Sequence, residues 1–442
     1  MSYRICVIAM LCVCLAGCGS SRTASNLNSS TNPSNPASLN TSTTVADQTE
    51  NNSSAANNFA SQSNGNIGAN NVSKVNVHSL LYPGATTKVL AHMMLWFGQS
   101  DHMNVGYTSN DAGQVRRQIQ DMISRGIDGV VMDWYGPNNS IDQAAQLVMH
   151  EAEKHSGFSF SIMIDAGAMG SNWCNGCSAE DVLGNLLQYV EKTYFPSSAY
   201  LNLGGQPIVT NFDIDSKYSP NWQKVNSQLK VAPRFFFQDD GGFSHPMSDG
   251  SYSWVMPETG NFGLDYLRNF YSVGIGFGKE ETVGAAYKGF NDTLAGWSSN
   301  RVMDQRCGKT WLQTFSQINS LYNQGRQLPY LQLVTWNDYE EGTEIESGID
   351  SCFSLQASVT ANTLNWSTAG DEDNIDNYTI YSSTDGQNLT KLTYVKPGTR
   401  SVDLCSLGIS KGGQQLYVQA VGKPSMANRM PAPVNYTPSC GN

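Results

Sequence analysis

Three carboxylates, Asp338, Glu340 and Glu341, stand close together in the segment 335–346, which reads TWNDYEEGTEIE. The segment follows the largely apolar run 331–334, so we expect it to begin where a buried strand ends. Cleavage of a glycosidic bond needs two carboxyl groups, one that protonates the leaving oxygen and one that acts on the opposite side of the sugar ring. This segment could supply both carboxyl groups. A solvated acidic loop is the alternative interpretation.

A general acid must hold its proton near neutral pH, and an apolar site or a neighbouring negative charge raises the pKa of a carboxyl group. Trp336 and Tyr339 supply apolar surroundings in this segment, and Asp338 or Glu340 supplies negative charge. In an extended chain Asp338 and Glu341 would point in opposite directions. A turn at 340–342 is therefore needed to bring both into one cleft.

Apolar segments alternate with helix-like segments over the range 86–336. The predicted strands are 89–97, 129–135, 158–165, 207–212, 234–238, 251–256, 283–287 and 330–336, and the clearest predicted helices are 112–125, 141–154, 179–194 and 310–324. In the first helix Val115, Ile119, Met122 and Ile123 fall on one face, at three- and four-residue spacing. This alternation predicts an α/β fold, a (β/α)8 TIM barrel, with another α/β sheet as the alternative.

Polar and aromatic residues recur where the predicted strands end, and barrel active sites lie at the carboxyl ends of the strands. The candidate substrate-binding residues are His92, Trp96, Asp133, Trp134, Tyr135, Asp165, Asn211, Trp254, Tyr287, Trp336, Asn337, Tyr339 and Glu340. Several have a plainer explanation: Trp96, Trp134, Tyr135, Trp254 and Tyr287 can be core residues, Asp133 a buried structural acid and His92 an inner-barrel histidine. No spacing of His, Asp and Glu indicates a metal site, and we expect no cofactor.

Three stretches of the barrel candidate resemble glycoside hydrolase families 71 and 99 and their bacterial relatives: 89–97 (VLAHMMLWF), 126–136 (GIDGVVMDWYG) and 336–346 (WNDYEEGTEIE). In the last stretch Trp-Asn-Asp-Tyr is similar to family 71, which cleaves α-1,3-glucan. Glu-Gly-Thr-Glu-Ile-Glu is similar to family 99, the endo-α-mannosidases and mannanases. The resemblance implies hydrolysis of an α-linked glucan, mannan or exopolysaccharide, with Glu341 as general acid and Asp338 as base or its equivalent.

The chain departs from both families at two positions. Asp338 is one methylene shorter than the Glu of family 99, and Glu340 replaces the Gly of family 71 and the His of family 99. These differences support a second hypothesis, a non-catalytic glycan-binding or surface-assembly lipoprotein on a hydrolase scaffold. An extracytoplasmic enzyme of another class, such as a polysaccharide deacetylase, is a third interpretation, which the missing metal triad disfavours.

The N-terminus resembles a bacterial lipoprotein signal, with Arg4, the apolar run 5–15 and then Ala-Gly before Cys18. The apolar run is shorter than the roughly 20 residues that span a membrane. We expect cleavage before Cys18 and lipidation of that residue, with an ordinary signal peptide as the alternative. Because Gly19 rather than Asp follows the cysteine, the resemblance favours the outer membrane or the cell surface within the cell envelope.

Composition divides the chain into four predicted parts: the signal at 1–18, a disordered linker at 19–75, the barrel domain at 76–354 and a sandwich at 355–442. The linker is rich in Asn, Ser and Thr and cannot bury enough apolar surface to fold. The last part alternates polar and apolar residues around an Asp-Gly turn and resembles a fibronectin type III domain, with Trp366 as its core aromatic. We expect it to act as a spacer or stabilising partner, and sugar binding is the alternative.

Six cysteines remain after the signal and Cys18, and an even count in an exported protein predicts disulfides. The expected pairs are Cys174–Cys177, Cys307–Cys352 and Cys405–Cys440, although spacing does not determine the connectivity and the first pair could be a redox site. The net charge of −11 argues against nucleic acid as a partner. We therefore expect a monomer whose partners are a neutral polysaccharide and, through the lipid, a membrane.

Overall fold

The computed structural model describes residues 71–440 of the 442-residue chain. The predicted signal, Cys18 and the predicted linker up to residue 70 lie outside the described residues. Asn71, Val72 and Ser73 are buried, and the backbone N–H of Ser73 donates to the carbonyl of Met426 at 2.8 Å. The folded part of the chain therefore begins before the predicted boundary at 76.

Parallel strands close into a barrel, as the sequence predicts. In barrel order they are β1 (Lys88–Met93), β2 (Gly129–Trp134), β3 (Ser159–Asp165), β5 (Gln206–Phe212), β6 (Arg234–Gln238), β7 (Gly250–Tyr252), β8 (Glu281–Ala286) and β11 (Tyr330–Leu333). Strand β11 pairs with β1, with Val89 opposite Leu331, and this pairing closes the ring. Every residue of β2 is buried, as expected for a parallel strand that is covered on both faces.

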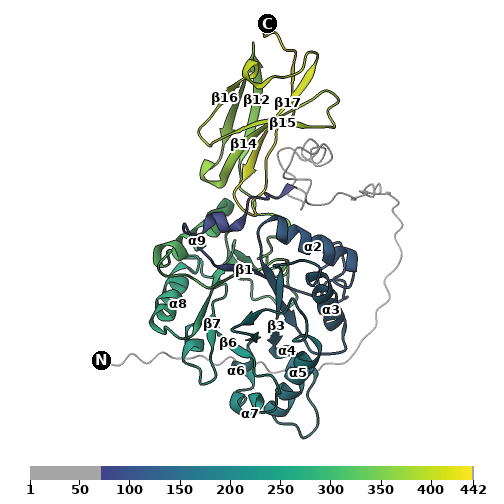
Figure 1. Cartoon of the computed structure of the whole chain (residues 1–442), viewed down its shortest axis with the longest axis vertical. Coiled ribbons are helices and arrows are strands. Elements are labelled where there is room, and N and C mark those ends of the chain that lie inside the picture. Colours follow the sequence, from purple (N-terminus) through teal and green to yellow (C-terminus); the bar gives the residue numbers. More distant parts are fainter. Residues whose placement is uncertain (1–70, 441–442) are drawn as a thin grey trace, which may run out of the picture. The chain divides into compact units, whose positions relative to one another are not determined.

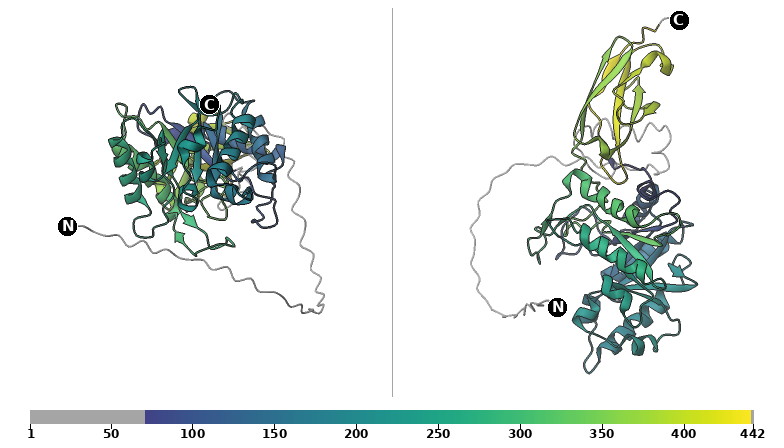
Figure 2. Two further views of the ribbon diagram at one scale, coloured as in Figure 1. Left: turned by 90° about the horizontal axis from the view of Figure 1, so that it is seen from below. Right: turned by 90° about the vertical axis from the view of Figure 1, so that its left-hand side faces the viewer.

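Helices surround the strands in the barrel (Figure 1), and the views in Figure 2 show the same arrangement from two other sides. They are α2 (Ala112–Ser124), α3 (Ser140–Ala152), α4 (Ala166–Ser171), α5 (Ala179–Thr193), α6 (Ile214–Lys217), α7 (Trp222–Asn226), α8 (Leu264–Gly276) and α9 (Lys309–Leu321). Short strands lie outside the ring at β4 (Asn202–Leu203), β9 (Phe290–Asn291) and β10 (Val302–Met303), and β9 and β10 pair as a hairpin.

Local sequence explains where several helices begin. The Asp111 carboxylate accepts the N–H of Gly113 at the start of α2, and Ser178 and Asp181 form a capping box at the start of α5. Helix α8 has Gly263 at its N-cap and no side-chain cap. This helix therefore lacks the start signal that polar caps give.

The predicted apolar face of α2 is correct at three of its four positions. Val115, Ile119 and Met122 are at most 1% exposed, but Ile123 is 39% exposed. The prediction for Ile123 is wrong, because it follows Met122 directly and so points about 100° away around the helix.

The C-terminal strands form two antiparallel sheets. One contains β12 (Ser354–Thr360), β13 (Thr363–Ala369) and β16 (Ser401–Asp403), and the other contains β14 (Ile375–Ser383), β15 (Thr390–Val395), β17 (Gln414–Gly422) and β18 (Val434–Tyr436). Trp366 is 4% exposed and belongs to a separate apolar core with residues of both sheets. The sandwich therefore has its own core, and its likeness to a fibronectin type III domain stays a prediction.

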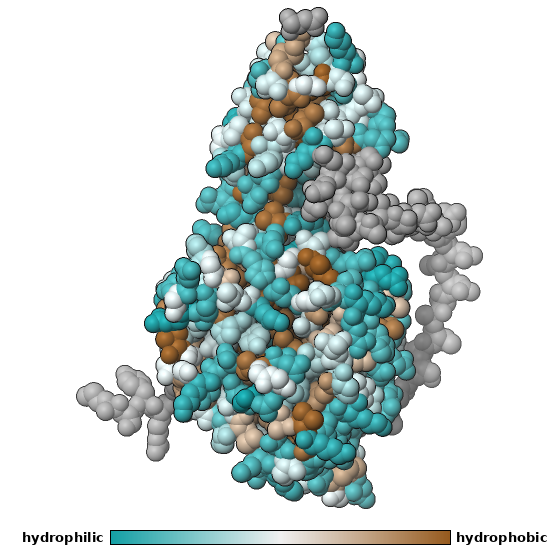
Figure 3. Space-filling view, in the orientation of Figure 1, coloured by the Kyte–Doolittle hydropathy of each residue, from teal (hydrophilic) through white to brown (hydrophobic). Residues whose placement is uncertain are grey.

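Three disulfides join the cysteines as expected: Cys174–Cys177, Cys307–Cys352 and Cys405–Cys440. The face shown in Figure 3 is mostly hydrophilic, with apolar side chains in small separate patches. Within residues 71–440, no helix has the length and apolar character required to cross a membrane.

Substitution of Ile119 by alanine tests the assignment of the α2 face. The side chain is fully buried, so its truncation leaves a cavity and should lower the free energy of unfolding by about 2–5 kcal/mol. Denaturant unfolding measures this change. Ile123→Ala on the same helix is the matched control and should cost clearly less; an equal cost would contradict the observed orientation of α2.

Candidate active site

A cavity of about 680 Å³ lies at the carboxyl ends of the barrel strands, a size typical of ligand sites. Its wall includes the last residues of three strands, Asp165 of β3, Phe212 of β5 and Gln238 of β6. Asp338 and Glu341, on the loop after β11, complete the wall. Residues far apart in the sequence therefore meet here because parallel strands end at one mouth.

The structure brings most of the predicted residues together and places the others behind the wall. Those that line the cavity are His92, Trp96, Asp133, Tyr135, Asp165, Trp254, Asp338 and Glu341. The lining does not include Trp134, Asn211, Tyr287, Trp336, Asn337, Tyr339 or Glu340. The prediction placed these seven side chains in the cleft. In the structure they lie behind the cavity wall, where they contact neighbouring segments.

Four of the seven anchor neighbouring segments. The indole N–H of Trp134 donates to Asp142 at 2.9 Å, and the Tyr287 hydroxyl donates to the carbonyl of Phe262 at 3.0 Å. The Asn211 amide donates to the carbonyl of Phe236 at 3.4 Å. The Tyr339 hydroxyl donates to Glu346 at 3.0 Å. Polar groups committed to such bonds are poor candidates for direct substrate contact.

Asn337 fastens the loop after β11 to the first strand of the barrel. Its carbonyl oxygen accepts the N–H of Met94 at 2.8 Å, and its amide donates to the carbonyl of Met94 at 3.0 Å. The neighbouring Trp336 donates its backbone N–H to the carbonyl of His92 at 2.7 Å. The loop thus continues the β1–β11 pairing beyond the end of the strands.

Arg125, at the end of α2, holds the same loop from behind. Its guanidinium is fully buried and donates to the carbonyls of Ile345 at 2.7 Å and Glu346 at 2.8 Å. It also forms an ion pair with Asp121 and lies over the Trp336 ring, 4.8 Å from its centroid. A buried charge is tolerated when it is paired and hydrogen-bonded, and each guanidinium nitrogen of Arg125 makes at least one such bond.

The Asp338 carboxylate closes the turn that the sequence predicts at 340–342. Its Oδ1 accepts the backbone N–H of Glu340 at 3.0 Å and that of Glu341 at 2.8 Å. Gly342 follows with a φ of 61°, a left-handed conformation that suits glycine. This turn allows Asp338 and Glu341, three residues apart, to line one cavity.

Burial governs the protonation of this pair. It raises the pKa of Glu341 to about 7, against the lowering effect of the Arg301 guanidinium. Burial and then the Glu341 charge raise the pKa of Asp338 as well, while the two backbone N–H groups oppose that rise. The pair therefore retains a proton near neutral pH. The N–H bonds favour the charged form of Asp338 but do not reverse the rise in its pKa.

Two further carboxyl groups add to the acidity of the cavity. Asp133 is 5% exposed, and its Oδ1 has no hydrogen-bond partner within residues 71–440. Burial, then the charges of Asp165 and Asp338, raise the pKa of Asp133. Asp165 caps helix α4 by accepting the N–H of Gly167. The unpartnered oxygen of Asp133 therefore suits a hydroxyl donor on a ligand.

His92 is a neutral imidazole rather than a cation. It is 1% exposed, and burial lowers its pKa to about 3. Its ring makes an edge contact with Trp254 at 4.7 Å, and Nδ1 lies 3.4 Å from the side-chain amide of Gln332. The described residues contain no group of three His, Cys, Asp or Glu side chains arranged to hold a metal ion.

Glu340 fixes a neighbouring loop. Its carboxylate accepts the N–H of Met103 at 2.8 Å and lies 3.2 Å from Nδ1 of His102. Although burial opposes the change, these hydrogen bonds hold the pKa of Glu340 below its ordinary value. The His102 ring stacks on Trp96 at 4.7 Å, and both rings line the cavity. The third carboxylate therefore positions an aromatic wall.

The structure also adds cavity residues that sequence reasoning missed. They are Met94, His102, Ile141, Phe212, Asp213, Lys217, Gln238, Val255, Met256, Pro257, Phe290, Trp297 and Arg301. Phe212 and Gln238 end predicted strands, so their positions were readable from the strand pattern. Trp297 and Arg301 belong to the β9–β10 hairpin and follow no regular strand signal.

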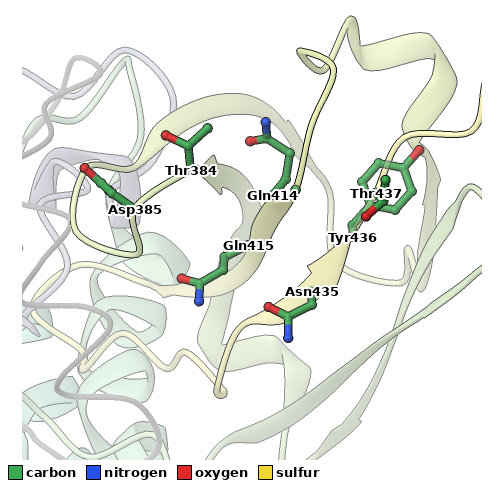
Figure 4. Close-up of a pocket in the computed structure, with 8 residues that line it drawn as sticks. Thr384, Asp385, Gln414, Gln415, Asn435, Tyr436 and Thr437 are labelled. Atoms are coloured by element: carbon green, nitrogen blue, oxygen red, sulfur yellow. The ribbon is translucent and has the colours of Figure 1, made fainter.

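A second hollow lies on the sandwich and has a different character (Figure 4). It is lined by Thr384, Asp385, Gly413, Gln414, Gln415, Asn435, Tyr436 and Thr437. Its one carboxylate accepts the N–H groups of Gln387 and Asn388 at 2.8 and 2.7 Å. The hollow therefore has a single carboxylate, already hydrogen-bonded within its own turn, whereas acetal cleavage needs two carboxyl groups.

Comparison with known proteins identifies the barrel. The family model described as glycosyl hydrolase family 71 matches residues 85–368. Two solved structures of the family 99 endo-α-mannosidase from Bacteroides thetaiotaomicron align with 59% of this chain, each with a TM-score of 0.47. One, with bis-tris-propane bound, is 18% identical over 86% of its own chain, and the other is 17% identical over 87%. No curated protein matches the chain.

Glu341→Gln should stabilise the folded protein at alkaline pH. The folded pKa of about 7 exceeds the ordinary 4.5, so this group's contribution to stability is greatest below pH 4.5 and is lost as the pH rises through 7. Glutamine does not ionise, so the variant should retain the free energy of unfolding that the wild type loses, at most about 3 kcal/mol at pH 8. Denaturant unfolding at pH 5 and pH 8 measures it. The exposed Glu258 provides the control variant Glu258→Gln, and equal pH dependence in wild type and Glu341→Gln would refute the assignment.

Proposed function

The chain belongs to glycosyl hydrolase family 71 and is a glycoside hydrolase, and we propose that it cleaves an α-linked polysaccharide with Glu341 and Asp338 as its working carboxyl groups. The substrate class we propose is a glucan, a mannan or an exopolysaccharide. One observation carries the proposal: Asp338 and Glu341 line the same strand-end cavity, where burial raises the pKa of Glu341 to about 7.

Glu341 acts as the general acid. It donates its proton to the glycosidic oxygen as the bond from that oxygen to the anomeric carbon breaks, so the leaving sugar departs as a neutral alcohol. A pKa near the working pH suits this role, because such a group is protonated in a useful fraction of molecules and still transfers its proton readily. The Arg301 charge keeps the pKa of Glu341 from rising further.

Asp338 acts as the base. It accepts the proton that the incoming nucleophile loses, and its Oδ1 stays fixed by the N–H groups of Glu340 and Glu341. Those bonds stabilise the negative charge that a base must carry. The turn also gives the side chain one orientation, which offsets some of the reach that Asp loses relative to Glu.

The remaining lining suits a neutral sugar. Trp96, Tyr135 and Trp254 present aromatic rings to the cavity, and such rings bury the apolar faces of pyranoses while leaving their hydroxyls to polar groups. Asp133 offers a buried oxygen that a sugar hydroxyl can satisfy. The net charge of −11 fits an uncharged polymer better than an anionic one.

Hydrolysis by the purified chain should be assayed on α-glucans, α-mannans and cell-envelope polysaccharides, with new reducing ends and binding as readouts. We expect wild-type kcat/KM to fall about tenfold per pH unit above pH 7, as Glu341 loses its proton.

Glu341→Gln and Asp338→Asn should each lower kcat by about 10²–10⁴-fold while the protein stays folded.

Glu258→Gln is again the control, because Glu258 is exposed and does not line the cavity. Binding of a polysaccharide without new reducing ends would contradict the two-carboxylate mechanism. Undiminished turnover in Glu341→Gln would remove that residue from the reaction.

We also propose that a lipid on Cys18 anchors the enzyme in the cell envelope, at the outer membrane or the cell surface. The basis is the signal-like sequence before Cys18, which resembles that of bacterial lipoproteins. Cys18→Ala should move the protein from the membrane fraction to the soluble fraction of the cell envelope, measured by fractionation and immunoblotting. Membrane retention of that variant would argue for another mode of attachment.

A further inference from the structure

The β9–β10 hairpin carries an unusual group of exposed apolar side chains. Leu294 is 75% exposed, Trp297 52% and Val302 46%. Single exposed apolar residues are common on proteins, so the position of each decides whether it can meet a ligand. Trp297 alone of these three lines the active-site cavity. The exposed indole therefore adjoins the catalytic centre rather than a remote surface.

The loop that carries Trp297 is held in a fixed shape. The Asp292 side chain is fully buried and accepts bonds from the backbone N–H and Nε of Arg301 at 2.7 and 2.8 Å and from the Ser298 hydroxyl at 2.9 Å. The backbone N–H of Ala295 also donates to the carbonyl of Asp292 at 3.0 Å. A rigid aromatic surface loses little entropy when a ligand covers it.

The same hairpin is joined to the catalytic loop. The backbone N–H of Asn291 donates to the carbonyl of Glu341 at 2.7 Å. The Arg301 guanidinium, which lowers the pKa of Glu341, lies over the Phe290 ring, 4.8 Å from its centroid. The position of Trp297 is therefore tied, through a few bonds, to the position of the general acid.

We propose that Trp297 is an outer sugar-binding platform, which stacks on the apolar face of a pyranose unit of the polymer beyond the unit that is cleaved. This inference rests on the proposed function and deepens it. A polymer that leaves the cavity past the β9–β10 hairpin covers the exposed indole, and removal of that surface from water favours binding. Such stacking favours an uncharged polymer in which successive sugar units present a face of C–H groups.

The test is the dependence of binding and catalysis on chain length. Oligosaccharides of two to seven units, from both the α-1,3-glucan and the α-mannan series, are titrated by calorimetry into Glu341→Gln with and without Trp297→Ala. We expect affinity to rise with length in Glu341→Gln. The added Trp297→Ala should lower the affinity for the longest oligosaccharides by about 10- to 100-fold and that for the disaccharides by less. In the active enzyme Trp297→Ala should lower kcat/KM in the same length-dependent way.

Two variants sharpen the result. Trp297→Tyr keeps a ring and should recover most of the loss, and Leu294→Ala, on the same loop but outside the cavity lining, should behave as wild type. An equal loss at every length, or none, would overturn the platform while leaving hydrolysis by the wild type intact. Absence of both hydrolysis and binding for every oligosaccharide would overturn the proposed function together with the platform.

Discussion

The attachment of the last strand's exit loop to the first strand is the constraint on which the site depends. Asn337 bonds both backbone groups of Met94, and Arg125 bonds the carbonyls of Ile345 and Glu346. These bonds hold both ends of a turn that would otherwise be an acidic surface loop. The loop is thereby kept at the barrel mouth, where Asp338 is buried and Glu341 partly buried, and the raised pKa values of both follow from that position.

Crowded buried carboxyl groups destabilise a fold, since each loses hydration and repels the others. The cavity wall contains Asp133, Asp165, Asp338 and Glu341, and its Lys and Arg side chains are Lys217 and Arg301. Their burial is therefore hard to explain as a device for stability. It is readily explained by chemistry that needs one proton held and another accepted at the same pH.

Sequence reasoning predicted the barrel because its strands are apolar and regularly spaced, and it placed Asp338 and Glu341 in one cleft because both follow a strand directly. It missed α8, whose N-cap is Gly263. It misjudged Glu340, since a sequence shows that three carboxylates are close but not which way each points. The partner that turns Glu340 away is His102, 238 positions earlier in the chain. Such long-range pairing leaves no local signal.

The alternation of side chains along a strand could have distinguished residues that line the cavity from residues behind its wall better than composition did. Successive side chains of a strand point to opposite faces, so Asp133 and Tyr135 should share a face and Trp134 should take the other. The structure agrees: the first two line the cavity, while Trp134 stacks on Tyr189 of α5, outside the ring. The same rule fails in the loop after β11, where the turn at 340–342 replaces strand geometry. There the bonds made by Asp338, together with the contact between Glu340 and His102, decide which carboxylates line the cavity.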